Sequence, residues 1–224
     1  MTTGQARVLV WDWTVRLFHW LTVLLVASMW WTAEEGMMDW HRRIGMILVG
    51  LISYRIVWGL IGPPTARFAR MVPTPQAALA YLGDLRAGRH KVSLGHNPVG
   101  VLSVFAMLLA LTVQVSTGLF SVDVDGIESG PLSRHVSFET GRLFAEIHET
   151  SFNILLALIV LHVLAIATYL VFFKDNLVRP MVTGRRASTD FDASVADNRA
   201  GLIRVVIALA AAFAAMSAIW FAGG

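Results

Sequence analysis

The chain has 224 residues, of which 56% are hydrophobic, and its formal net charge is +3. The hydrophobic share exceeds that of ordinary globular domains, and the apolar residues occur in long blocks. The absence of cysteine excludes disulfides, thiolate metal sites, iron–sulfur clusters and the covalent attachment of a c-type haem. The basic residues are spread among short loops, so we expect no nucleic-acid partner.

Five apolar segments are long enough to cross a membrane, which takes about 20 helical residues. The first two are the least apolar because they contain His19, Arg42, Arg43 and Arg55. The predicted spans are residues 15–33, 41–61, 99–120, 148–173 and 202–222. The sequence therefore predicts an all-α integral membrane helical bundle, with a four-helix core and a fifth, C-terminal transmembrane helix.

Turn and cap residues mark the ends of these helices. Gly62-Pro63-Pro64 ends the second span, and Asn97-Pro98 begins the third, with Asn97 as its N-cap. Thr74-Pro75 begins a shorter helix, whose apolar face predicts a position on the cytoplasmic membrane surface.

Composition divides the chain into three parts. Residues 1–184 form the membrane domain of four spans, and residues 201–224 form the C-terminal transmembrane helix. The polar segment between them, residues 185–200, predicts a flexible cytoplasmic linker.

The charge of the loops predicts the orientation. Loops 62–96 and 174–199 are rich in arginine and lysine, whereas loop 121–147 is acidic. Short basic loops usually face the cytoplasm. We therefore expect a cytoplasmic N-terminus and a C-terminus on the outer side. Arg42 and Arg43 lie on the side that this rule disfavours.

Four of the seven histidines fall inside or at the ends of predicted spans: His19, His41, His148 and His162. Ionisable groups inside a membrane are costly and are usually functional. His148 and His162 are fourteen residues apart, so they face the same side of one helix with an axial separation of about 21 Å. Because successive spans alternate in direction, His19 shares the inner depth of His162, and His41 shares the outer depth of His148.

Two histidines at one depth on different helices can occupy both axial positions of one haem iron. Because the chain offers two such pairs, the spacing favours two haems in the interior of the bundle. Zinc usually takes three or four ligands in one cluster, which two separate pairs do not provide. For any single histidine, a hydrogen bond between helices is the alternative interpretation.

Three arginines and two glycines are candidates for further haem contacts. Arg55 shares the inner depth and is either a partner of haem propionates or a snorkelling arginine. Arg42 and Arg43 would also offset propionate charge. Gly45 and Gly50 would let a flat macrocycle approach the second helix, although glycine is also common at plain helix contacts.

The remaining histidines, His90, His96 and His135, fall in loops, and we expect them to face solvent or cap helices. His96 is the spare candidate for a propionate contact or for a proton-carrying group at a quinone site.

The following motifs occur in order along the chain: Val10-Trp11-Asp12, Arg16-Leu17-Phe18-His19-Trp20, His41-Arg42-Arg43-Ile44-Gly45, Tyr54-Arg55-Ile56-Val57-Trp58-Gly59, Gly95-His96-Asn97-Pro98, Ile147-His148-Glu149, Leu161-His162-Val163 and Met181-Val182-Thr183-Gly184. In these motifs the sequence resembles the bacterial cytochrome b561 and nickel-hydrogenase b-type cytochrome family, over most of residues 8–184. The fifth span is consistent with the hydrogenase-type members.

The resemblance implies two haem b groups held by His19, His41, His148 and His162. It also implies a bacterial inner-membrane protein surrounded by lipid, in which the C-terminus expected on the outer side would lie in the periplasm. Such a protein exchanges electrons between a quinone pool and a separate redox partner, a hydrogenase or a c-type cytochrome. It is then an electron carrier or an oxidoreductase subunit rather than a stand-alone enzyme. The alternatives are a proton-coupled transporter that uses the intramembrane histidines, a structural anchor, and a quinone-dependent oxidoreductase that acts on a small oxidant.

Overall fold

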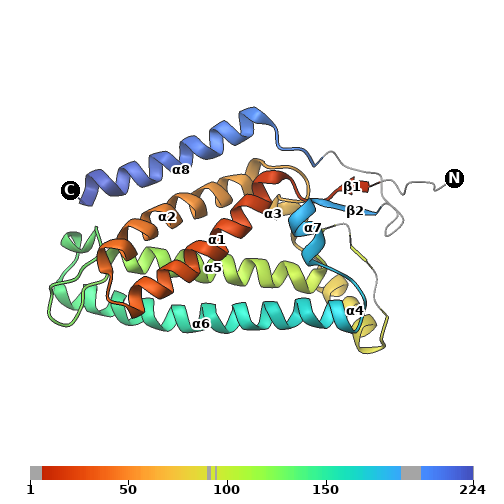
Figure 1. Ribbon diagram of the computed structural model, residues 1–224, viewed down its shortest axis with the longest axis horizontal. Helices are drawn as coiled ribbons and strands as arrows, with labels where there is room; N and C mark the ends of the chain where they lie inside the picture. Colours follow the sequence, from red (N-terminus) through yellow and green to blue (C-terminus); the bar gives the residue numbers. More distant parts are fainter. Residues whose placement is uncertain (1–6, 90–91, 94, 188–197, 224) are drawn as a thin grey trace.

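The computed structural model describes residues 7–89, 92–93, 95–187 and 198–223 (Figure 1). Within these residues, five helices are long and apolar enough to cross a membrane. They are α1 (Trp13–Glu34), α2 (Met38–Ile61), α5 (Pro98–Phe120), α6 (Phe138–Val171) and α8 (Leu202–Gly223). The five predicted spans and the helical membrane fold are thereby confirmed.

The shorter elements lie at the two ends of the bundle. At one end are α3 (Phe68–Met71), α4 (Pro75–Arg86), α7 (Val178–Thr183) and the strands β1 (Arg7–Leu9) and β2 (Arg185–Ala187) (Figure 1). We call this the basic end, because it contains the arginine-rich segments 62–89 and 174–186. The acidic end is formed by loop 121–137, which includes the short 3-10 helix η1 (Ser133–His135).

Side-chain caps begin two helices at the predicted positions. Asn97 accepts a hydrogen bond from the backbone N–H of Gly100 at 2.7 Å and begins α5. Thr74 accepts one from the N–H of Ala77 at 3.2 Å and begins α4. Each cap satisfies an N–H group that has no partner within the first helical turn.

The helix α6 begins at Phe138, ten residues before the expected start at His148. Ser137 caps it by accepting a hydrogen bond from the N–H of Thr140 at 3.2 Å. With 34 residues the helix is about 51 Å long, which exceeds the hydrocarbon thickness of about 30 Å. The expected start was therefore wrong, because apolarity marks the depth of the lipid and not the full extent of a helix.

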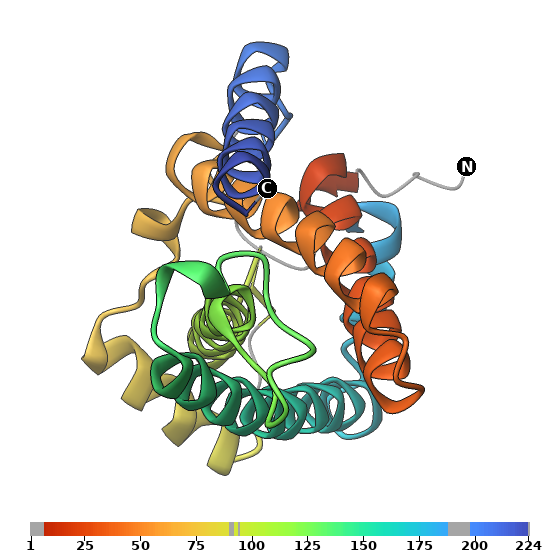
Figure 2. The same cartoon turned by 90° about the vertical axis from the view of Figure 1, so that its left-hand side faces the viewer.

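The long helices pack as an antiparallel bundle. α5 packs against α6, and α2 packs against both α1 and α8. Viewed along the bundle, α1, α2, α5 and α6 surround a common interior, whereas α8 lies on the outer side of α2 (Figure 2). This arrangement is the predicted four-helix core with an additional C-terminal helix.

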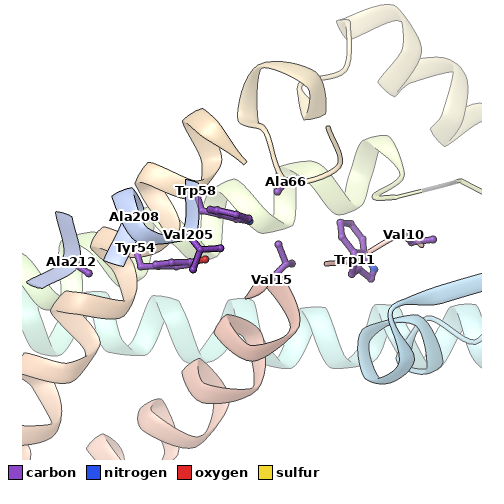
Figure 3. Close-up of a cluster of buried hydrophobic side chains, with 9 residues drawn as sticks. All are labelled: Val10, Trp11, Val15, Tyr54, Trp58, Ala66, Val205, Ala208 and Ala212. Carbon is purple, nitrogen blue, oxygen red and sulfur yellow. The ribbon is translucent and has the colours of Figure 1, made fainter. Parts of the chain in front are cut away.

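A cluster of buried side chains joins α8 and the N-terminal segment to the core (Figure 3). Tyr54 and Trp58 of α2 stack with ring centroids 5.7 Å apart, and Ala208 of α8 is fully buried. Gly50 of α2 also lies at the contact with α8, because a Cβ at this position would overlap Sδ of Met216. Small residues let membrane helices approach closely. The complete cluster is Val10, Trp11, Val15, Tyr54, Trp58, Ala66, Val205, Ala208 and Ala212.

Part of the predicted linker is ordered. Residues 185–187 form β2, which pairs antiparallel with β1 and places Arg7 opposite Ala187. The expectation of a flexible linker is therefore wrong for these three residues, since backbone hydrogen bonds to β1 hold them. Asn198 is buried and donates a hydrogen bond to the carbonyl of Leu9 at 3.0 Å. Residues 188–197 of the predicted linker lie outside the described residues, as does His90.

Candidate functional site

Near the acidic end, His41 of α2 and His148 of α6 face each other across the interior. Their ring centroids are 6.3 Å apart, and the ring planes are inclined at 78°. A metal–imidazole bond is about 2 Å long, and the ring centre lies about 1.1 Å behind the bonding nitrogen. Two axial imidazoles therefore place their centroids about 6 Å apart. The observed separation fits one metal ion held between the two rings.

Hydrogen bonds orient both rings in the same way. Nδ1 of His41 lies 3.0 Å from the carbonyl oxygen of Met29, and Nδ1 of His148 lies 2.8 Å from that of Gln114. A carbonyl oxygen only accepts, so Nδ1 carries the proton in both rings. Nε2 then holds the lone pair in each, which is the arrangement that a metal-binding histidine requires.

Gln114 is a candidate site residue that the sequence analysis missed, and its amide has to turn away from Nε2 of His148 for that nitrogen to bind a metal ion. Its side-chain amide nitrogen lies 3.0 Å from Nε2 of His148, and because that nitrogen carries the lone pair, the amide donates to it. The hydroxyl of Ser151 donates to Oε1 of Gln114, which orients the amide. A single glutamine within the apolar third span was a signal for such a role, since polar side chains in membrane helices mark interhelical or functional contacts.

A cavity of about 390 Å³ surrounds the His41–His148 pair. Its walls come from α1, α2, α5, α6 and the acidic-end loop, and they are largely apolar, with Val26, Leu111 and Leu155 among them. Cofactor sites in helical bundles usually lie between the helices and have volumes of about 300–1,000 Å³. The cavity therefore fits an apolar cofactor held between the helices.

Glycine keeps the wall of α5 close to the His148 ring. A Cβ on Gly118 would lie only 2.7 Å from Cε1 of His148, so any larger residue would displace the ring. Gly45, singled out from the sequence, lines the same cavity and has only Met29 near the position of a Cβ, at 3.4 Å. Gly50, also singled out, faces α8 and is not a wall of this cavity.

Arg42 lies at the acidic end of the cavity and is already paired. It forms salt bridges with Asp39 at 2.6 Å and with Glu128 of the acidic loop. These two carboxylates explain how an arginine is accommodated on the side that the charge rule disfavours. Arg43 is exposed and lies over the ring of Trp40 at 5.4 Å.

Toward the basic end, His19 of α1 and His162 of α6 form the second pair, and they interact electrostatically. Nδ1 of His19 is buried and has no hydrogen-bond partner among the described residues. An unsatisfied buried nitrogen costs about 1–3 kcal/mol, so it points to a partner that the polypeptide does not supply. The donor set, two imidazoles on facing helices, matches that of the first pair.

Arg55 is buried deep in the bundle, with only 5% of its surface exposed. Its guanidinium lies 4.8 Å from the ring centroid of Phe68 and 5.9 Å from that of Phe18. Among the described residues, it has no carboxylate within 4 Å. A snorkelling arginine extends its charge to water, so this burial disagrees with that interpretation. The buried cation instead has donors available for an anionic group.

His96 lies in the loop before α5 and is turned toward the inner pair. Its ring lies 4.6 Å from that of the buried Trp11. Burial, together with the positive charges of the nearby Arg55, His162 and His19, lowers the pKa of His96 to about 4. The expectation that His96 faces solvent or caps a helix was wrong, because Asn97 provides the cap and Trp11 covers the ring.

No group of three or more His, Asp or Glu side chains suited to a metal ion occurs within the described residues. The four histidines of the long helices instead lie as two pairs, His41 with His148 and His19 with His162. His135 is remote from both, since its Nε2 lies 2.9 Å from the carbonyl oxygen of Ala222 near the C-terminus.

Comparison with protein families gives one match. The family model described as prokaryotic cytochrome b561 matches residues 10–184, which extend from the end of β1 to the end of α7 and include all four paired histidines. Comparison with curated proteins and comparison with solved structures gave no match.

Proposed function

Because the chain belongs to the prokaryotic cytochrome b561 family, and is therefore a multi-pass b-type membrane cytochrome of electron transfer, we propose that it binds two haem b groups and passes electrons between them across the membrane. The observation that carries this proposal is the His41–His148 pair. Its 6.3 Å ring separation and common tautomer suit the two axial positions of one iron.

We assign His41 and His148 to the haem near the acidic end, and His19 and His162 to the haem toward the basic end. Each haem, when bound, supplies a one-electron redox centre. The four imidazoles would hold the two irons, the carbonyls of Met29 and Gln114 orient His41 and His148, and the apolar walls around that pair would exclude water. Arg55 is the proposed partner of the inner propionates, because it is a buried cation with no carboxylate within 4 Å among the described residues.

Arg42 is the proposed contact for the outer haem, since it lines the cavity around His41 and His148. Its salt bridges with Asp39 and Glu128 hold the guanidinium in place but neutralise much of its charge. Arg42 therefore acts mainly by hydrogen bonding and position, whereas Arg55 acts mainly by charge.

The proposed orientation places the basic end in the cytoplasm of a bacterial cell, because arginine and lysine gather there. The C-terminus of α8 then lies in the periplasm. The proposed electron donors and acceptors are a membrane quinone and a separate hydrogenase or c-type cytochrome, as in the family that the motifs resemble.

The test is the haem content of the purified protein. Pyridine haemochrome analysis is expected to give about two b-type haems per chain, extractable with acidic acetone because no cysteine attaches them. A reduced-minus-oxidised spectrum is expected to contain two components that titrate separately. A folded, membrane-inserted preparation that takes up no haem would overturn the proposal and would favour a transporter.

A further inference from the structure

A second cavity lies at the basic end, apart from both histidine pairs. Its volume is about 580 Å³, and its lining residues come from the turn after α6, from α7 and from the β1–β2 pair. Figure 1 shows these segments at the same end of the bundle. It is lined by Arg7, Lys174, Asp175, Asn176, Arg179, Pro180, Thr183, Arg185, Arg186 and Ala187. None of the residues assigned to haem binding contributes to it.

The lining is strongly cationic. One of its five cations, Arg186, forms a buried salt bridge with Asp175 and also donates to the carbonyl of Ser93 at 3.2 Å. The other four are exposed, and none of them has a carboxylate within 4 Å among the described residues: Arg7, Lys174, Arg179 and Arg185. The buried salt bridge thus belongs to the wall, and the open side of the cavity has a net positive charge.

The fold gathers these charges from distant parts of the chain. Pairing of β1 with β2 brings Arg7 beside residues 185–187. Gly184, with a φ of 79°, ends α7, and its carbonyl accepts the N–H groups of Val10 and Trp11 at 2.8 and 3.1 Å. The turn after α6 presents Lys174 in a left-handed conformation with a φ of 57°, which is costly for a residue with a Cβ. The basic cavity is therefore a product of tertiary structure.

Apolar side chains are exposed directly beside the cavity. Val178 and Val182 lie on one face of α7, four residues apart, whereas the cavity residues Arg179 and Thr183 lie on the adjacent face. Phe172, at the end of α6, is 76% exposed. In a membrane this end of the bundle meets the boundary between the acyl chains and the headgroups, so the cations lie at headgroup level and the apolar side chains face the lipid.

We propose that the basic cavity binds the phosphate of an anionic phospholipid, with the acyl chains against the exposed side chains of α6 and α7. Arginine and lysine recognise phosphate through charge-assisted hydrogen bonds. A free phosphate would use the cations alone, whereas a lipid uses both the cations and the adjacent apolar surface. The bound lipid holds α7 and the β1–β2 pair against the membrane. This proposal goes beyond haem binding and does not depend on it.

The test compares lipid retention in two variants that lose the same charge at the same end. The variant Arg179→Gln/Arg185→Gln removes two exposed cations of the cavity, and the control Arg70→Gln/Arg86→Gln removes two exposed cations of α3 and α4. The protein is equilibrated with phosphatidylglycerol and phosphatidylcholine in equal amounts, and the bound lipid is measured by native mass spectrometry. Each lost cation is expected to weaken binding about 5-fold, so the cavity variant, which loses two, is expected to retain about 25-fold less phosphatidylglycerol.

The control variant and the charge-preserving variant Arg179→Lys/Arg185→Lys are expected to retain phosphatidylglycerol like the wild type. Equal retention in the cavity variant and the control would overturn the proposal. In a second arm, inorganic phosphate is added to protein in phosphatidylcholine nanodiscs. If phosphate alone raises the unfolding temperature as much as phosphatidylglycerol does, the occupant is a soluble anion and the lipid assignment is wrong. The haem content of all variants is expected to be unchanged, which separates this test from that of the proposed function.

Discussion

His41 and His148 lie on different helices, yet a backbone carbonyl holds Nδ1 of each ring, which leaves Nε2 as the nitrogen with the lone pair in both. The carbonyls belong to Met29 of α1 and Gln114 of α5, at 3.0 and 2.8 Å. All four helices of the core thus take part in orienting one pair of imidazoles. Such an arrangement limits the rotation of both rings before any cofactor binds.

The pairing of the histidines predicts which variants lose the same haem. His41→Ala and His148→Ala are expected to remove one spectral component, and His19→Ala and His162→Ala the other, because each iron has only two protein ligands in the proposal. The haem content of each variant then falls by about one per chain. Redox titration of each membrane-inserted variant measures this. His135→Ala, remote from both pairs, serves as the control and is expected to keep both components. The assignment fails if His19→Ala and His41→Ala remove the same component.

The close approach of Gly118 to His148 predicts a selective effect of a single methyl group. Gly118→Ala would place a Cβ 2.7 Å from Cε1 of His148 and displace the ring from its orientation. The component lost in His148→Ala is expected to be lost or strongly shifted, while the other component is kept. Gly83→Ala on α4 is the matched control, because nothing lies within 4 Å of its Cβ position. Unchanged spectra in Gly118→Ala would show that the ring does not need this space.

The burial of Arg55 predicts an effect on redox potential. A buried cation stabilises the reduced haem, so Arg55→Gln is expected to lower the midpoint potential of the inner haem by roughly 60 mV, the one-electron equivalent of a tenfold change. Arg55→Lys retains the charge and is expected to restore most of the potential. The exposed Arg43 is screened by solvent, and Arg43→Gln is expected to leave both potentials almost unchanged. Equal potentials in Arg55→Gln and the wild type would remove Arg55 from the proposed site.

The distribution of charge predicts the topology. A reporter fused after Arg89, near the end of the basic segment, is expected to be cytoplasmic, and one fused after Glu128, in the acidic loop, is expected to be periplasmic. Paired phosphatase and fluorescent-protein fusions at the two positions measure this. The reverse result would exchange the sides of the two haems and would place the basic cavity in the outer leaflet.

The buried cap of α1 predicts a loss of stability. One carboxylate, that of Asp12, accepts hydrogen bonds from the N–H groups of Thr14 and Val15 and, at 3.3 Å, from Nε1 of Trp58. Asp12→Ala leaves these donors unsatisfied and is expected to cost about 2–3 kcal/mol of stability, measured by unfolding in detergent. Thr74→Ala removes the exposed cap of α4 and is expected to cost about 1 kcal/mol or less. Equal losses of stability in the two variants would mean that burial of the Asp12 hydrogen bonds adds nothing to the free energy of unfolding.

The sequence by itself determined which histidines lie together along the bundle. The rise per residue of a helix converts the spacing of His148 and His162 into a distance along the bundle, and the alternating direction of the spans assigns each a partner at the same level. Asn97 and Thr74 began their helices where expected, because a cap acts within a few residues of the chain. Whether the paired histidines bind haem stays a prediction.

Tertiary structure decided what lies around each helix at a given depth. Contacts across helices depend on how the helices rotate and pack, and no local pattern encodes that rotation. Gln114 beside His148, Glu128 on Arg42 and Trp11 over His96 were therefore not predicted. For the same reason, the pairing of Arg7 with Ala187 was not predicted. A strand of three residues is stabilised by hydrogen bonds to its partner rather than by its own sequence. Residues 185–187, which were expected to be flexible, therefore line the basic cavity.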